Sequence, residues 1–350
     1  MEAETQILSS IFGESPSVHS GHLRSTFSHH RCPFAKITHS AFCNAYSQFA
    51  QMANDDNTAA EVAKSFSCRT DNIKSIADIL TSLYFDSNRD QPCFIEASPT
   101  EITFIVTGNT KSQQARLVIT IDVFEDYICN CDSIKCSVNL TVFLDCLKLF
   151  GSSDNTTATL SYSTGDDVIN LSLEELGVIT TCEITSLYCD DYDDFDQQSL
   201  FIAFRDCPEE CQLILKSEPL RESVQELTDA FWAGSIRFQV TSTPPLMKLM
   251  TSGSIGAYEI SIPRSSEAFV SFQCRNAVNF SYPLRSFVFG MKALSVSKEA
   301  FIRVNSRGML CVQHLIETSN KKATCLDFLM LAEDDGADAD AAGDIGPSGT

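Results

Sequence analysis

Acidic side chains are the first candidates for chemistry, because the chain holds 46 aspartates and glutamates against 25 lysines and arginines. A metal-dependent nuclease needs carboxylates that converge on Mg²⁺ ions about 4 Å apart. Two acid pairs, Asp122 with Glu125 and Asp166 with Asp167, lie in predicted turns without a third acid or a lysine at a recognisable spacing. Such clusters are expected by chance in so acidic a chain, so we predict no enzyme.

Cysteines and histidines are the second candidates, as metal ligands or nucleophiles. The chain has 15 cysteines, an odd number without a regular framework, which favours reduced thiols. No set has the paired spacing of a zinc site, and no phosphate-binding GxxxxGK loop occurs, so we predict neither metal nor cofactor. The sets considered are Cys207 with Cys211, Cys129 with Cys131 and Cys136, and the group His29, His30, Cys32, His39 and Cys43.

Composition indicates a globular protein with a strongly uneven charge. The chain has 350 residues, 43% of them hydrophobic, and a net charge of −21. No run of 18 apolar residues predicts a membrane span, and the N-terminus does not resemble a secretory signal. The acidic residues crowd into the stretch 190–196 and the tail 333–344, so any basic surface must be local.

The sequence predicts two successive halves with the same order of helices and strands, and these elements would position the side chains of any site. Asn139 and Thr141 are both competent N-caps of a short apolar helix that stops near Gly151, and other helices are predicted over 71–84, from Ser217 and from Ser281. Alternating, β-branched runs predict the strands between them. These strands are 92–96, 101–107, 116–121, 135–140, 158–164, 168–173, 177–185, 200–204, 211–216, 235–241, 246–251, 254–262, 267–273, 299–304, 309–316 and 323–329.

This pattern predicts five segments. Residues 1–65 form a disordered extension, 66–185 a first domain, 186–210 an acidic connector, 211–330 a second domain, and 331–350 a disordered acidic tail. The fold class is α+β, with helices on one face of a mostly antiparallel sheet in each domain.

The architecture resembles the sliding-clamp, PCNA-like fold, and four segments are similar to the Rad-one family of checkpoint clamp subunits. The most specific is KCSVNLTVFLDCLKLFGSS over 135–153. The others are TDNIKSIADILTSLYF over 70–85, LILKSEPLRESVQEL over 213–227 and RVNSRGMLCVQ over 303–313. The resemblance as a whole covers about residues 66–330.

The resemblance implies a non-catalytic subunit of a heterotrimeric ring that encircles double-stranded DNA without sequence specificity and acts in the nucleus. Its partners would be Rad-nine and Hus-one type subunits, a clamp loader, and repair and checkpoint proteins. The alternatives are a metal-dependent DNA exonuclease, an activity for which the resembled family has been suspected, and a self-trimerising replication clamp. The only Lys-Lys pair, Lys321 and Lys322, is a poor import sequence, so import with a partner is expected.

The resemblance also implies three groups of site residues. Helices line the hole of a clamp, so the cations expected to face DNA are Lys74, Lys148, Lys216, Arg221, Arg285 and Lys292. Acids on the same helices (Asp78, Asp145, Glu222 and Glu226) weaken that field. Edge strands join clamp subunits, and here they are expected at Gly177, Val178, Ile179, Thr180, Thr181 and Cys182, and at Ile255, Ala257, Tyr258, Glu259 and Ile260. Partner peptides with basic flanks are expected at Leu187, Tyr188, Tyr192 and Phe195.

Overall fold

The computed structural model describes residues 64–71, 73–85, 90–108, 110–150, 156–187, 199–228, 234–254, 256–318 and 321–333. All of them belong to one compact unit, Val62–Thr350. The predicted extension and tail lie almost wholly outside the described residues, and the predicted domain boundaries stay predictions. No helix in these ranges is both long and apolar enough to cross a membrane.

The described elements form two halves with the same order: one strand, a helix, five strands, a helix and three strands. The first half comprises β1 (Ser65–Thr70), α3 (Ile73–Thr81), β2 (Pro92–Ala97), β3 (Glu101–Thr107), β4 (Gln113–Thr120), β5 (Asp126–Cys129), β6 (Ile134–Asn139), α4 (Leu140–Leu147), β7 (Thr157–Ser163), β8 (Val168–Glu175) and β9 (Val178–Thr185). After α5 (Ser199–Arg205), the second half comprises β10 (Glu209–Lys216), α6 (Ser217–Thr228), β11 (Ser235–Ser242), β12 (Pro245–Gly253), β13 (Gly256–Pro263), β14 (Phe269–Cys274), β15 (Val278–Pro283), α7 (Leu284–Gly290), β16 (Glu299–Asn305), β17 (Leu310–Glu317) and β18 (Ala323–Met330).

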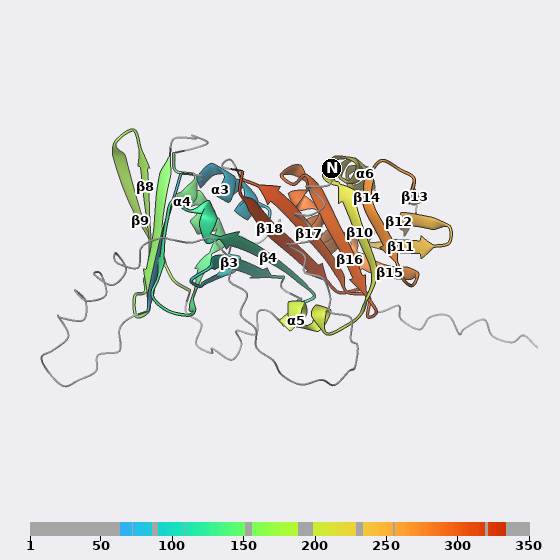
Figure 1. Cartoon of the computed structure of the whole chain (residues 1–350), viewed down its shortest axis with the longest axis horizontal. Helices are drawn as coiled ribbons and strands as arrows, with labels where there is room; N and C mark the ends of the chain where they lie inside the picture. The colour runs from blue at the N-terminus through green and yellow to red at the C-terminus, as the bar shows by residue number, and fades with distance from the viewer. Residues whose placement is uncertain are drawn as a thin grey trace, which may run out of the picture. The chain divides into compact units, whose positions relative to one another are not determined.

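These strands form three antiparallel sheets (Figure 1). The central sheet has nine strands in the order β14-β10-β16-β17-β18-β4-β3-β2-β6, and it continues from one half into the other where β18 pairs with β4. The second sheet has the order β5-β1-β7-β8-β9 and the third β13-β12-β11-β15. The two halves therefore share a continuous hydrogen-bonded sheet.

Helices α3, α4, α6 and α7 bury apolar side chains against one face of these sheets. Phe143 of α4 is 2% exposed, and Phe287 of α7 is 1% exposed. Each helix alternates such residues with polar ones at helical spacing, which fixes the face that packs. Asn139 is the cap of α4, since its side chain accepts hydrogen bonds from the N–H groups of Thr141 and Val142. The predicted α+β clamp fold, with helices on one sheet face, is confirmed.

Several element predictions were wrong. Residues 200–204 form part of helix α5 instead of a strand, because a short apolar run fits both periods and Phe201 and Phe204 pack on one side. The helix expected from Ser281 begins at Leu284, and the preceding residues complete β15. Strand β5 was missed because it is short and half-exposed. Helix α4 ends at Leu147, before the expected stop at Gly151, which lies outside the described residues.

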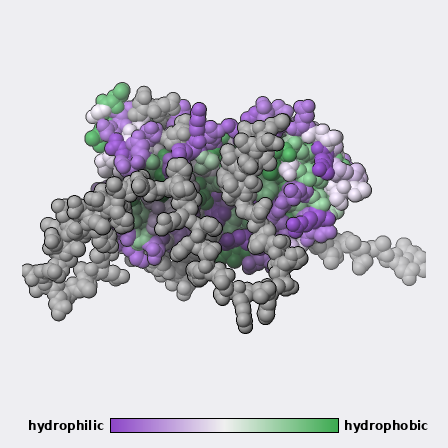
Figure 2. Space-filling model, in the orientation of Figure 1, coloured by the Kyte–Doolittle hydropathy of each residue, from purple (hydrophilic) through white to green (hydrophobic). Residues whose placement is uncertain are grey.

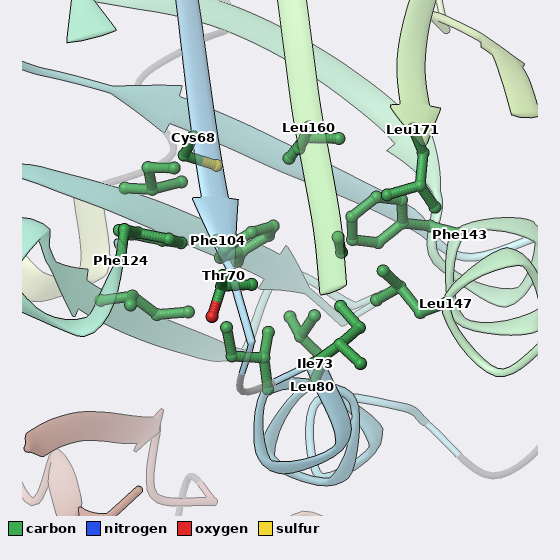
Figure 3. Close-up of a pocket in the computed structure, with 14 residues that line it drawn as sticks. Cys68, Thr70, Ile73, Leu80, Phe104, Phe124, Phe143, Leu147, Leu160 and Leu171 are labelled. Atoms are coloured by element: carbon green, nitrogen blue, oxygen red, sulfur yellow. The ribbon is translucent and has the colours of Figure 1, made fainter. Parts of the chain in front are cut away.

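A small cavity of about 30 Å³ lies in the core of the first half, between α3, α4 and the sheets (Figure 3). Its lining includes Leu80, Phe104, Phe143 and Leu147, all apolar. This volume has room for no more than a few water molecules and the lining is mostly apolar, so the cavity is a packing defect rather than a ligand site.

The one described histidine, His314, is buried in β17 at 0% exposure. Its Nε2–H donates to the Gly290 carbonyl at 2.8 Å, and Nδ1 lies 3.2 Å from Ser297 Oγ. Burial lowers the pKa of His314 from 6.5 to about 4, although the bond to Gly290 opposes the shift. The side chain therefore stays neutral in the folded protein over a range where the unfolded chain takes up a proton.

We expect the free energy of unfolding to fall by about 2 kcal/mol between pH 7 and pH 5 because of His314. The folded pKa is depressed, so this contribution is present above the unfolded pKa of 6.5 and is lost as the pH falls toward 4. Urea denaturation at the two pH values measures the fall. A His314→Gln variant should lack that part of the pH dependence, and an identical dependence in both proteins would contradict the prediction.

Candidate functional site

The predicted DNA-facing cations lie on or beside the helices. Lys74 is on α3, Arg221 on α6 and Arg285 on α7, and all three are exposed. Lys216 is the exposed last residue of β10, directly before α6. The four acids expected on the same helices, Asp78, Asp145, Glu222 and Glu226, are exposed too. The helix surface thus carries mixed charge, and its positive field is weak.

Lys292 and Lys148, both among the predicted cations, donate hydrogen bonds within the protein. Lys292 is half-buried, and its Nζ donates to the carbonyl of Tyr84 at 2.6 Å, a contact from the second half to the first. Lys148 follows α4 and is exposed, and its Nζ donates to Thr81 Oγ1 at 2.8 Å. The ammonium of Lys292 is therefore held by the protein itself, while that of Lys148 has only an exposed hydroxyl.

Strand β9 is an edge of its sheet in the described part of the chain. It follows a two-residue turn of Leu176 and Gly177, both with positive φ, the geometry of tight hairpins. Leu176 is 90% exposed and Ile179 is 65% exposed. Figure 2 shows this apolar hairpin end in green. The predicted residues from Val178 to Cys182 thus lie on a strand with one unpaired side.

The outward groups of β9 follow from the ladder with β8. The Ser186 N–H donates to the Asp167 carbonyl at 2.8 Å, in the same register as the strand pair. Because hydrogen-bonded pairs alternate along an antiparallel ladder, the backbone groups of Ile179, Thr181 and Glu183 point away from β8. These N–H and C=O groups are available to another strand.

Strand β13 is likewise an edge, of the third sheet. The Arg264 N–H donates to the Pro245 carbonyl at 3.1 Å in the register of the β12–β13 pair. By the same alternation, the backbone groups of Ala257, Glu259 and Ser261 point outward. The predicted residues Ala257, Tyr258, Glu259 and Ile260 lie on this strand, and Ile255 lies outside the described residues.

The internal joint between β18 and β4 shows how such edges fit together. Strand β9 holds the place in the first half that β18 holds in the second, and β13 holds the place of β4. In the internal joint Asp327 faces Arg116, and the Leu331 N–H donates to the Ser112 carbonyl at 2.9 Å. The same alternation there directs the backbone groups of Asp327 at β4. Matching residues strand by strand through the paired strands of the two halves makes Thr181 of β9 the equivalent of Asp327 of β18. The same matching makes Glu259 of β13 the equivalent of Arg116 of β4. Both equivalents carry outward backbone groups, so the two free edges repeat the two sides of this joint.

The sequence did not predict the layer beneath α5, on the opposite face of the central sheet. Phe201 lies over the guanidinium of Arg116 at 4.3 Å, and Phe204 lies over that of Arg303 at 5.3 Å. Arg116 also donates to Asp327 at 2.7 Å. Helix α5 stands apart from the other helices in Figure 1. The spacing of the two phenylalanines in the sequence could have indicated a helix with one apolar side. It could not have indicated the arginines beneath, because these come from strands far away in the sequence.

Of the predicted partner-peptide residues, Leu187 is described. It is 39% exposed, and its backbone N–H and carbonyl both bond to Ser137. Tyr188, Tyr192 and Phe195 lie outside the described residues.

The acid pairs do not converge in the part of the chain that the structure describes. Asp122 bonds to Thr120 and lies 3.5 Å from Lys322, and Glu125 lies 3.3 Å from Arg69. The hydrogen bond from Thr120 is the main cause of the lowered pKa of Asp122. No group of three or more His, Cys, Asp or Glu side chains among the described residues could hold a metal ion. These acids therefore serve separate local contacts.

The described cysteines are free thiols. Burial raises the pKa of Cys211 to about 12 and that of Cys311 to about 11, so both stay protonated at neutral pH. Cys129 and Cys131 have their Sγ atoms 3.8 Å apart, and Cys136 is buried. Neither Cys207 with Cys211 nor Cys129 with Cys131 and Cys136 belongs to a described group that could hold a metal ion. The set of His29, His30, Cys32, His39 and Cys43 lies outside the described residues.

Comparison with known proteins identifies relatives over most of the chain. A family model described as "Repair protein Rad1/Rec1/Rad17" matches residues 65–316. The chain is 29% identical over 271 residues to "Cell cycle checkpoint protein RAD1" of Mus musculus, covering 76% of this chain and 91% of that protein. It is 28% identical over 291 residues to the protein of the same name from Homo sapiens, covering 81% and 96%. It is 24% identical over 161 residues to "DNA damage checkpoint control protein rad1" of Schizosaccharomyces pombe, covering 46% and 47%.

Proposed function

The chain belongs to the Rad1 family of DNA repair and checkpoint proteins, and from this premise we propose how its surfaces serve a ring. It is a DNA-damage checkpoint clamp subunit. We propose that it joins two unlike clamp subunits, of the Rad-nine and Hus-one types, in a ring that a clamp loader places around double-stranded DNA in the nucleus. There the ring recruits repair and checkpoint proteins, and this subunit takes no catalytic part.

One observation carries the proposal: β9 and β13, two of the edge strands of the described sheets, repeat the two sides of the joint between β18 and β4. Exposed edges with unpaired backbone groups favour association with another strand. A subunit with one such edge in each half can join a neighbour on both sides, which is what closing a ring requires.

Light scattering tests the assembly. The measured molar mass of the purified chain should be near 38.5 kDa, the mass of one chain. When the two partner subunits are present, it should form a complex of three different chains. A trimer of this chain alone would favour the self-trimerising replication clamp. Release of nucleotides from end-labelled DNA with Mg²⁺ would favour the exonuclease, provided that substitution of Asp122 and Glu125 removes it.

The helix surface would face the DNA. Enclosure by a ring needs few phosphate contacts and no reading of bases, which suits the sparse cations of this surface. Lys74, Arg221 and Arg285 are the exposed members on three different helices. The acidic connector, with Leu187, Tyr188, Tyr192 and Phe195, stays a sequence-based proposal for peptides with basic flanks.

Changing Lys74, Arg221 and Arg285 together to glutamine should weaken retention of the assembled ring on circular DNA. Each phosphate contact contributes about 0.9 to the slope of log affinity against log salt, so the slope should fall by up to about 3. The matched control changes three exposed arginines that lie on no helix, Arg237, Arg264 and Arg275. An equal fall in both variants would contradict a DNA-facing role for the helix surface.

A further inference from the structure

Beside the joint between β18 and β4, a lysine of the second half bonds to the first half. An equivalent lysine lies beside the edge strand β9, where no neighbouring half is present to complete the same contact. Lys292 Nζ donates to the Tyr84 carbonyl at 2.6 Å. The Tyr84 N–H bonds to the Thr81 carbonyl at 3.2 Å, so Tyr84 closes the last turn after α3. Beside this contact the rings of Phe85 and Phe289 stack at 3.8 Å. Lys292 therefore fastens the second half to the turn that follows α3 in the first half.

Lys148 is the counterpart of Lys292 in the first half. Helix α4 begins at Leu140, directly after β6, and α7 begins at Leu284, directly after β15. Each lysine stands eight residues after the first residue of its helix. The buried phenylalanines of the two helices match in the same count, Phe143 with Phe287. Sequence and packing thus place the two lysines at equivalent points.

The two helices also approach their last strands in the same way. A side chain at Gly290 of α7 would meet Met330 at 2.6 Å and Phe328 at 3.6 Å, so α7 lies close on β18. The equivalent residue of α4 is Cys146, which neighbours Cys182 of β9. Burial first, and then this second thiol, raise the pKa of Cys146 to about 11. Because α4 lies on β9 as α7 lies on β18, Lys148 stands beside the free edge as Lys292 stands beside the internal joint.

We propose that Lys148 is a latch between subunits: across the β9 edge it donates to a backbone carbonyl in the turn that follows a helix of the neighbouring subunit. This inference rests on the proposed ring. By the equivalence of the joints, that helix is the neighbour's counterpart of α6, the first helix of the half that supplies the pairing strand. Without a neighbour, Lys148 bonds to the exposed hydroxyl of Thr81. On assembly it exchanges this hydroxyl for a backbone carbonyl of the neighbour, and so it acts in closing the ring rather than in holding DNA.

The test uses the full chain with a Lys148→Met substitution and each of the two partner subunits separately. Hydrogen bonds to charged groups contribute enough that loss of the latch should raise the dissociation constant about tenfold or more. The rise should occur with the one subunit that joins at β9 and not with the one that joins at β13. A Lys74→Met variant, with the same charge change on the neighbouring helix α3, should bind both subunits as the unchanged chain does. Lys148→Arg should recover part of the affinity.

Unchanged binding of both subunits by Lys148→Met would overturn the latch. If the Lys148 and Lys74 variants instead lose retention on DNA equally while assembly is intact, Lys148 belongs with the DNA-facing cations. Failure of the unchanged chain to bind either partner would instead reject the proposed ring itself, so the two failures are distinguishable. The urea midpoint of the isolated variant should match that of the unchanged chain, because the bond it loses is exposed.

Discussion

Replacing Thr181 by proline is expected to prevent association across the β9 edge while the isolated chain stays folded. Thr181 is exposed, and its N–H points away from β8, where a neighbouring strand would accept it. Proline removes that donor and places its ring in the path of the partner strand, yet edge strands tolerate it on their free side. We expect the affinity for the neighbour at this edge to fall at least a hundredfold.

The matched control is Thr181→Val, which keeps the backbone N–H and the β-branched shape. It should bind the neighbour within a few-fold of the unchanged chain. Titration by surface plasmon resonance measures both variants, and thermal unfolding shows whether the fold is intact. Assembly by the proline variant at unchanged affinity would mean that β9 is not the strand that joins the neighbour.

Truncation of Phe143 to alanine should cause the largest loss of stability in the first half. Phe143 is 2% exposed, and its ring centroid lies 6.2 Å from that of Phe104. It already borders the cavity of Figure 3, so removing the ring adds empty volume that the rigid sheets cannot close. Substitutions of this kind cost about 3–5 kcal/mol.

Urea denaturation measures this loss. Val142, the preceding residue of the same helix, is 46% exposed, and Val142→Ala should change the free energy of unfolding by no more than about 0.5 kcal/mol. Phe143→Leu should cost less than Phe143→Ala because it leaves a smaller void. A cost below about 1 kcal/mol for Phe143→Ala would show that α4 does not depend on this contact.

Local patterns were sufficient for most of the fold. Asn139 caps α4 as its side-chain chemistry predicts, and the apolar spacing of α3 and α4 identifies the residues they bury. The strand alternation gave 101–107 as β3 and located β9 and β13 within two residues. These features depend on neighbours along the chain, which the sequence displays directly.

The failures share a physical cause. Residues 200–204 are apolar and short, and the choice between strand and helix was made by the surface that receives Phe201 and Phe204. That surface includes Arg116 and Arg303, which lie far apart in sequence and meet only because β18 pairs with β4. Periodicity carries no information on such long-range contacts.

By itself the sequence determined the doubled order of elements, the inward faces of the helices and a set of lysines and arginines beside them, because each follows from spacing along the chain. The tertiary structure alone decided which protein groups Lys292 and Lys148 contact. Lys292 reaches the Tyr84 carbonyl and Lys148 reaches Thr81, although both occupy the same position after similar helices. The reason is that one stands at a completed joint and the other at an open edge, a difference set by strand pairing between residues more than 200 positions apart.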